Sequence, residues 1–341
     1  MTATAPPPVI LYHYSFSPYA RRVVWYLRLR RIPYRECLQP PTLPRPWVAL
    51  LGLKYRRIPI LSIGRDVYLD SRLILTKLTR LFPSPEYPSL AAPPGTAAAG
   101  IERLFSAWAT DAGLFTCGLQ LIPGADLPLV KEPAFQRDRA DYTGSAISAA
   151  EVVALRPEAM SEFRDAMDML ETTFLADGRE WILGGQGPTL ADIEAVWLVH
   201  WLTGLKGAVD EAVISARNFP KVYAWVGRFQ AKAAAVKGQG VVIEKVGGEE
   251  AKEIINESEF VEEEGVVDGD EPVVKFYALE RGQKVEVWPV DSGSAHIDTG
   301  RLVSVDAREI VWETDQRMRV HAPRHGFRIR PVLAPHSGAN L

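Results

Sequence analysis

The sequence contains few of the features that mark extracellular, metal-binding or membrane proteins. Its only two cysteines, Cys37 and Cys117, are far apart and form no C-x-x-C motif. Their number and spacing argue against a disulfide scaffold, a zinc site or a dithiol redox enzyme. The six histidines show no metal-ligand spacing, so we expect no metal. No apolar run approaches the roughly 20 residues of a membrane-spanning helix, and we therefore expect no membrane partner.

The chain also has little net charge, −3 at pH 7 over 341 residues. Such a balance gives no general field for an anionic partner, so we do not expect nucleic acid to bind. With 47% apolar and 24% charged residues, the composition is that of a globular protein with two or three domains. The first eight residues, MTATAPPP, are too short and polar for a secretory signal. We expect residues 1–8 to be a disordered lead and the protein to be cytoplasmic.

The first chemically informative stretch runs from Val9 to Arg31. A short apolar strand leads into a tight polar turn, and Pro18 then opens an amphipathic helix, since proline suits a first helical turn. Ser17 therefore lies where free backbone N–H groups and the helix dipole favour negative charge. A thiolate, phosphate or carboxylate would be stabilised there. The alternative is that Ser17 is only a helix cap worth about 1 kcal/mol.

Two later segments continue an alternating strand and helix pattern. Arg57–Leu61 is a strand interrupted near its start by proline, which indicates a strand end, an edge or a cis turn. Asp66–Leu69 is the next short strand, and Asp70 with Ser71 caps a following apolar helix. The pattern predicts a small α/β domain over residues 9–82.

The middle of the chain has helical periodicity. The proline-rich residues 83–95 are typical of a linker. Further helices are indicated around Pro157–Ala176 and from Leu190 to Leu202, where Thr189 and Asp192 have capping-box spacing. These signals predict an all-α domain over residues 96–237. Its first helix carries a stripe that is most often core, formed by Ile101, Leu104, Phe105, Trp108, Ala112 and Phe115.

The order of these motifs resembles that of the glutathione S-transferases. A strand is followed by the S-P-Y-A-R-R helix, then R-I-P-I-L, then D-S before a helix. The run F-S-P-Y-A is most similar to the serine-type tau class, to the omega class, in which cysteine replaces the serine, and to fungal relatives. The runs ILGGQGPTLADI and NFPKVYAW resemble motifs of the helical half. The resemblance implies a thioredoxin-like glutathione-binding domain at 9–82 and a transferase-type helical domain at 96–237.

The same resemblance implies a site for glutathione as co-substrate. Ser17 matches the catalytic residue, which donates a hydrogen bond to the glutathione sulfur. The backbone of Ile58, held by a cis Pro59, would pair with the cysteinyl part, while Asp70 and Ser71 would bind the γ-glutamyl end. Arg57 lies where the family often has a basic residue for the glycyl carboxylate. Taken alone, Asp70 and Ser71 would be an ordinary helix cap.

A second substrate, an apolar electrophilic small molecule, should bind between the Ser15–Tyr19 turn and the first helix of the all-α domain. The candidate pocket residues are Phe16, Trp108, Asp111 and Phe115. Taken singly, each of the three aromatic side chains is more typical of the core than of a pocket. The carboxylate of Asp111 is unexpected there, and faces either the cleft or the exposed edge of its helix.

Beyond residue 237 the resemblance ends. Glu244 to Glu271 contains twelve acidic residues against two lysines, which is typical of a solvated linker, expected at 238–271. Short strand-like runs then predict a small SH3-like or OB-like β-barrel over 272–333 and a tail at 334–341. These runs are Val273–Leu279, Lys284–Pro289, Gly300–Val305, Glu309–Thr314 and Met318–Val320.

One basic stretch lies within the expected barrel. Arg317–Arg330 carries five arginines and two histidines. It would be a solvated face, a surface that docks onto the acidic block of the chain, or a phosphate-binding surface.

Two functions are compatible with these patterns. The first is a glutathione transferase, a homodimer acting in detoxification or secondary metabolism, in which Ser17 activates the thiolate for attack on an electrophile. The second is a non-catalytic scaffold of the same fold with a partner-binding barrel. The acidic block and barrel favour the scaffold, since a transferase needs neither. The retained Ser17, Ile58-Pro59 and Asp70-Ser71 favour the enzyme.

Overall fold

The N-terminal part has the thioredoxin-like fold that the sequence predicts. The computed structural model describes residues 6–124, 127–144, 149–236 and 243–332, so that the expected tail at 334–341 and most of the lead lie outside the described residues. Strand β1 pairs with β2 in parallel and with β3 antiparallel, and β3 pairs with β4 antiparallel. The elements are β1 (Val9–His13), α1 (Pro18–Leu29), β2 (Tyr34–Leu38), α2 (Pro46–Ala49), β3 (Ile60–Ile63), β4 (Asp66–Leu69) and α3 (Ser71–Leu81).

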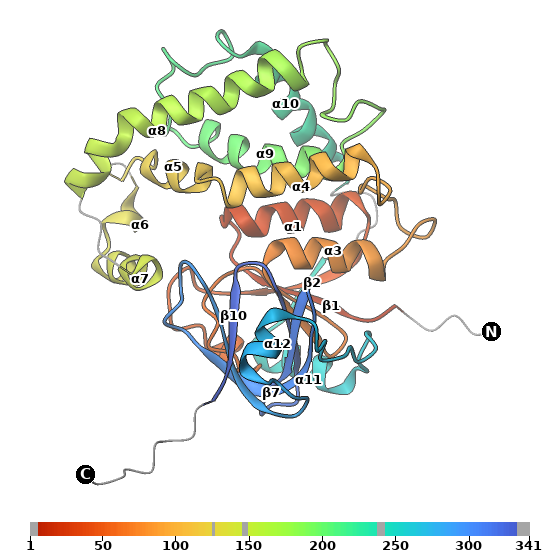
Figure 1. Cartoon of the computed structure of the whole chain (residues 1–341). Helices are drawn as coiled ribbons and strands as arrows, with labels where there is room; N and C mark the ends of the chain where they lie inside the picture. The colour runs from red at the N-terminus through yellow and green to blue at the C-terminus, as the bar shows by residue number, and fades with distance from the viewer. Residues whose placement is uncertain (1–5, 125–126, 145–148, 237–242, 333–341) are drawn as a thin grey trace.

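A helical layer packs against α1 and α3 on the side away from the sheet (Figure 1). The capping box at the start of α9 is confirmed, since Asp192 accepts a hydrogen bond from the Thr189 backbone N–H at 2.8 Å. A buried ion pair between Arg22 and Glu194 joins α1 to α9. The elements are α4 (Ala97–Thr110), α5 (Leu114–Gln120), α6 (Pro128–Lys131), α7 (Pro133–Thr143), α8 (Ala149–Met169), the π-helical turn η1 (Leu170–Phe174), α9 (Leu190–Thr203) and α10 (Pro220–Ala235).

The C-terminal part extends the thioredoxin-like sheet. Strand β9 pairs in parallel with β4, placing His321 opposite Tyr68, and β5 pairs in parallel with β2 at the other edge. The described strands form one sheet in the order β10-β6-β7-β8-β9-β4-β3-β1-β2-β5. The elements are β5 (Ile243–Lys245), α11 (Gly248–Glu257), α12 (Pro272–Tyr277), β6 (Lys284–Pro289), β7 (Asp298–Val305), β8 (Glu309–Glu313), β9 (Arg319–Pro323) and β10 (Phe327–Pro331).

This arrangement differs from the separate SH3-like or OB-like barrel that the sequence suggests. The C-terminal region is β-rich, but the sheet is not closed, because β9 pairs with β8 and β4. The prediction of a strand at Val273–Leu279 is wrong. Residues 273–277 belong to helix α12, because Pro272 at the first helical position favours a helix start.

Both faces of the central sheet are covered. On β1, Val9 and Leu11 belong to the core under α1 and α3, whereas Ile10 and Tyr12 belong to a second core shared with the C-terminal strands. The alternation follows from the period of two along a strand. Within the described residues, no helix combines the length and apolar character needed to cross a bilayer.

Candidate functional site

The sheet topology brings three of the candidate segments to the same end of the central strands. Tyr12 on β1 lies opposite Ile60 on β3, which in turn lies opposite Leu69 on β4. Strands β1 and β4 run in the same direction, and each ends in the N-terminus of a helix, α1 or α3. Strand β3 runs in the opposite direction and begins at this end, just after the Ile58–Pro59 peptide, which is cis as expected. Two helix N-termini and the start of β3 therefore converge there, and helix N-termini are suited to binding anions.

Ser17 caps α1 and is buried, with 2% of its surface exposed. Its Oγ accepts a hydrogen bond from the Ala20 backbone N–H at 3.2 Å. A hydroxyl that accepts one hydrogen bond still has its own proton to donate. Ser17 is thus both the helix cap and a potential donor at the positive end of the α1 dipole.

Asp70 stands at the start of α3 in a strained conformation, with φ 66° and ψ 127°. A positive φ is uncommon for a residue other than glycine and is often found at functional sites. Its carboxylate accepts hydrogen bonds from the Arg72 backbone N–H at 2.9 Å and from Nε at 3.1 Å. Burial alone would raise the pKa of Asp70, but the Arg72 guanidinium lowers it below the usual range. Ser71, the first residue of α3, is buried beside it.

Arg57 is held by the C-terminal part of the chain. Its guanidinium donates hydrogen bonds to the Asp291 carboxylate and to the Ser292 carbonyl, the latter from Nε at 2.8 Å. Burial would lower the pKa of Arg57, whereas Tyr55, Tyr142 and Asp291 raise it, and the net direction is upward. Arg57 is therefore a fixed positive charge.

The four residues expected for the second substrate do not share one set of surroundings. Phe16 is 49% exposed and contacts Tyr14. Phe115 is partly buried and packs on Tyr19 with ring centroids 4.7 Å apart, against the hydrophobic core.

Trp108, the third of these residues, lines a cavity of about 90 Å³ together with Cys117 and Met169. Asp111 is bound by Arg72 Nη1 at 2.9 Å and lies 3.2 Å from His325 Nε2. Asp111 is exposed at the C-terminal end of α4, as in the second alternative, but its ion pair there was not anticipated.

Several residues of this region are absent from the sequence-based site. Arg72 follows the D-S motif directly, and its positive charge two residues after Asp70 was the one sequence signal for their ion pair. Asp291, Ser292 and His325 come from loops more than 200 residues away along the chain, and no local pattern indicates that they meet Arg57 and Asp111.

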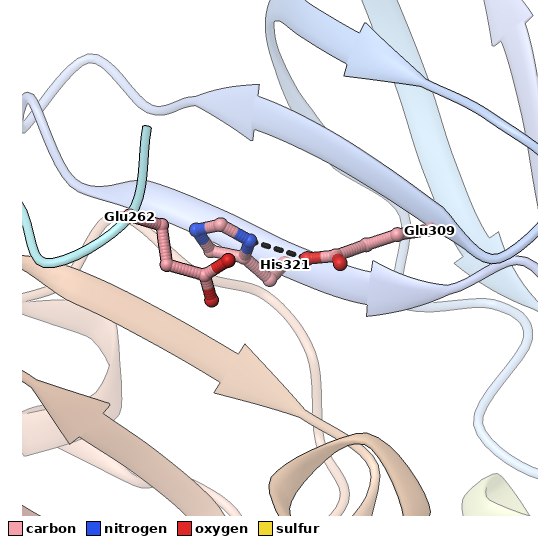
Figure 2. Close-up of side chains that lie close together, drawn as sticks. All are labelled: Glu262, Glu309 and His321. Atoms are coloured by element: carbon pink, nitrogen blue, oxygen red, sulfur yellow. Dashed lines mark hydrogen bonds and ion pairs between the residues drawn. The ribbon is translucent and has the colours of Figure 1, made fainter. Parts of the chain in front are cut away.

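A second cluster of polar side chains lies where β9 meets β4. Oxygen and nitrogen atoms of Glu262, Glu309 and His321 lie within 4.8 Å of one another, a spacing that would suit a metal (Figure 2). Lys77 Nζ, however, is 2.7 Å from both glutamates. His321 uses Nε2 on Asp66, at 2.8 Å, and Nδ1 on Glu309. The candidate ligands are thus engaged in an ion-pair network.

The basic stretch Arg317–Arg330 contributes to the same interface. Arg319 Nη1 donates to the Glu262 carbonyl at 2.7 Å, and Arg324 binds Glu271 at 2.7 Å. These two arginines therefore dock onto the acidic block of the chain, one of the three alternatives considered from the sequence.

Comparisons with known proteins agree with this fold. Residues 11–86 match the family model described as glutathione S-transferase, N-terminal domain. Residues 117–238 match a model described as a domain of unknown function, DUF7962. No curated protein matches the sequence.

Two solved structures are similar over most of their length. A GST-like protein from Pseudomonas syringae is 21% identical, with 96% of this chain and 100% of that chain covered and a TM-score of 0.64. The β-etherase LigF from Sphingobium sp. strain SYK-6 is 13% identical, with 68% of this chain and 99% of that chain covered and a TM-score of 0.52. The chain thus has a glutathione S-transferase-like fold, with an N-terminal domain that matches the model of that family.

Proposed function

We propose that this chain is a glutathione transferase in which Ser17 stabilises the glutathione thiolate for attack on an apolar electrophile. The observation that carries the proposal is that Ser17, the start of β3 and the strained Asp70 converge at one end of the central strands. The match of residues 11–86 to the transferase N-terminal domain supports it.

The proposed chemistry needs only a hydrogen-bond donor at Ser17. A thiol such as that of glutathione has a pKa near 8.5, and lowering it by about two units requires about 2.7 kcal/mol. A hydrogen bond to a charged acceptor contributes about 1.5 to 3 kcal/mol, and the α1 dipole adds to it. Because the Ser17 Oγ already accepts from Ala20, its hydroxyl is polarised to donate. The sulfur is the nucleophile, so Ser17 needs no general base.

The anchors expected for the rest of glutathione are the Ile58 backbone for the cysteinyl part and Asp70 with Ser71 for the γ-glutamyl end. A carboxylate suits the α-ammonium, and the α3 N-terminus suits the α-carboxylate. Arg57 is the candidate for the glycyl carboxylate. The serine-type subclass, similar to the tau class, is part of the proposal, as are the homodimer and the cytoplasmic location.

One observation favours the alternative, a non-catalytic scaffold. Arg57 is already engaged by Asp291, and Asp70 by Arg72, so that two expected anchors have partners within the chain.

Turnover of a chloronitrobenzene substrate with glutathione decides between the two functions. We expect the wild type to turn over and Ser17→Ala to lose about ten- to a hundredfold in rate while still binding glutathione. Binding without turnover, or equal rates for the two proteins, would contradict the catalytic role of Ser17.

A further inference from the structure

The loop between β6 and β7 lies against the candidate glutathione site. Its residues Asp291 and Ser292 bind the guanidinium of Arg57, which is 16% exposed, whereas the Asp291 side chain is 66% exposed. Arg57 is thus the buried member of the pair and Asp291 the solvent-facing one. An incoming ligand therefore meets an arginine whose charge is already paired.

The loop is held in this place by its neighbours. The Gly293 backbone N–H donates to the Tyr142 carbonyl on α7 at 2.8 Å. Gly293 has φ +75°, and a Cβ there would lie 2.9 Å from Arg56 Cγ, so the position demands glycine. His296 Nε2 lies 2.7 Å from Asp141, also on α7.

The end of the loop is attached to the segment that carries Arg57. Asp298 accepts hydrogen bonds from the backbone N–H groups of Lys54 at 2.6 Å and Tyr55 at 3.3 Å. Contacts on both sides, from α7 and from residues 54–57, therefore fix the backbone that presents Asp291.

The charges around Arg57 leave little attraction for a second carboxylate. Asp70, the other acidic residue of the candidate site, is also paired within the chain, with Arg72. A ligand carboxylate that approached Arg57 would have to displace the Asp291 carboxylate or lie beside it, and like charges at such separations repel.

We propose that Asp291 is a specificity-determining residue, which neutralises Arg57 so that the site accepts a γ-glutamylcysteinyl thiol with an uncharged C-terminal end as readily as glutathione itself. The inference rests on the proposed function, because it assumes that glutathione binds with its glycyl end at Arg57. It differs from that function in assigning a role to the C-terminal part of the chain.

The test compares glutathione with its glycyl ethyl ester, in which an uncharged ethyl ester replaces the terminal carboxylate. Calorimetric titration of the full chain gives the two dissociation constants for the wild type, for Asp291→Asn and for Asp270→Asn. Asp270 is a matched control, because it is also an exposed aspartate in an ion pair, with Lys275 at 2.8 Å. Because the Asp291 side chain is exposed, we expect Asp291→Asn to fold like the wild type.

We expect the wild type and Asp270→Asn to bind the acid and the ester with affinities within about twofold of each other. In Asp291→Asn, the acid should bind at least about fivefold more tightly than the ester, because Arg57 is then free to pair with the glycyl carboxylate.

If Asp291→Asn binds glutathione but has the same ratio of acid to ester affinity as the wild type, the inference is overturned. If neither thiol binds any of the three proteins, the proposed function fails, and this inference with it. The two failures are therefore distinguishable in one set of titrations.

Discussion

At the scale of single residues, the candidate site consists of side chains whose charges are balanced within the chain. Arg72 lies between Asp70 and Asp111, and Asp291 lies against Arg57. Ser17 and Ser71 differ from these residues, since both are neutral and buried. The sequence predicted Ser17, Asp70 and Ser71 because each stands at the start of a helix, where local spacing carries the signal. It could not predict that Asp291 and Ser292 bind Arg57 or that His325 contacts Asp111, because these partners come from distant loops.

Asp70→Asn tests the expected γ-glutamyl anchor. Asparagine tolerates a positive φ and keeps the cap of α3, but it removes the charge that pairs with Arg72, so we expect the free energy of unfolding to fall by about 1 to 3 kcal/mol. Glutathione should bind about tenfold more weakly, since the α-ammonium loses its ion pair with a carboxylate and keeps only a hydrogen bond to a neutral amide. Calorimetry gives the affinity and urea unfolding the stability. An affinity equal to that of the wild type would show that Asp70 is only a cap.

At the scale of secondary structure elements, the helix starts were the most predictable features. The capping box predicted the start of α9, and its Asp192 also accepts from the Ile182 backbone N–H and from Trp225 Nε1, both at 2.9 Å. The local pattern failed where context decides. Val273 and Val274 suggested a strand, whereas the preceding proline and the packing of Val274 in the core give helix α12.

Asp192→Ala measures what this cap contributes. The substitution leaves the buried N–H groups of Ile182, Thr189 and Trp225 without their acceptor, and each buried donor left unpaired costs about 1 to 3 kcal/mol. We expect a loss of about 3 kcal/mol in the free energy of unfolding by urea. The exposed Asp315→Ala serves as the control and should change it by less than about 0.5 kcal/mol. Equal effects of the two substitutions would refute the structural role.

At the scale of the whole molecule, the C-terminal strands continue the thioredoxin-like sheet. The sequence predicted most of these strands but not their attachment, because backbone pairing between β9 and β4 joins segments about 250 residues apart and leaves no local pattern. Ion pairs of Lys77 with Glu262 and Glu309 stabilise the same junction. There His321 also contacts Asp66 and, as Figure 2 shows, Glu309. The acidic block is thus partly an internal partner for basic side chains.

This junction should respond to pH through His321. Burial lowers the pKa of His321, but its bonds to Asp66 and Glu309 outweigh this effect and raise the pKa above its ordinary value. A raised pKa in the folded state stabilises the protein below about pH 6.5, and this contribution is lost as the pH rises through the folded pKa. Lys77, Glu262, Arg319 and Tyr68 are the other titratable groups that face the imidazole.

We expect the free energy of unfolding to fall from about pH 6.5 upwards, and to fall less in His321→Gln. Burial also raises the pKa of Asp298 and of Glu102 to about 7, which adds a decrease of the same sign in both proteins. The difference between wild type and variant, from urea unfolding at a series of pH values, therefore isolates His321. Parallel pH profiles would show that His321 stays in one protonation state.

The most direct test of the proposed chemistry is the pKa of the glutathione thiol when it is bound to the protein. Ultraviolet absorbance of the thiolate, followed against pH, gives this value for the wild type and for Ser17→Ala. We predict a pKa about two units below the free value near 8.5 in the wild type, and a return most of the way to 8.5 in Ser17→Ala. An unshifted pKa in the wild type, or an equal shift in the two proteins, would contradict thiolate stabilisation by Ser17.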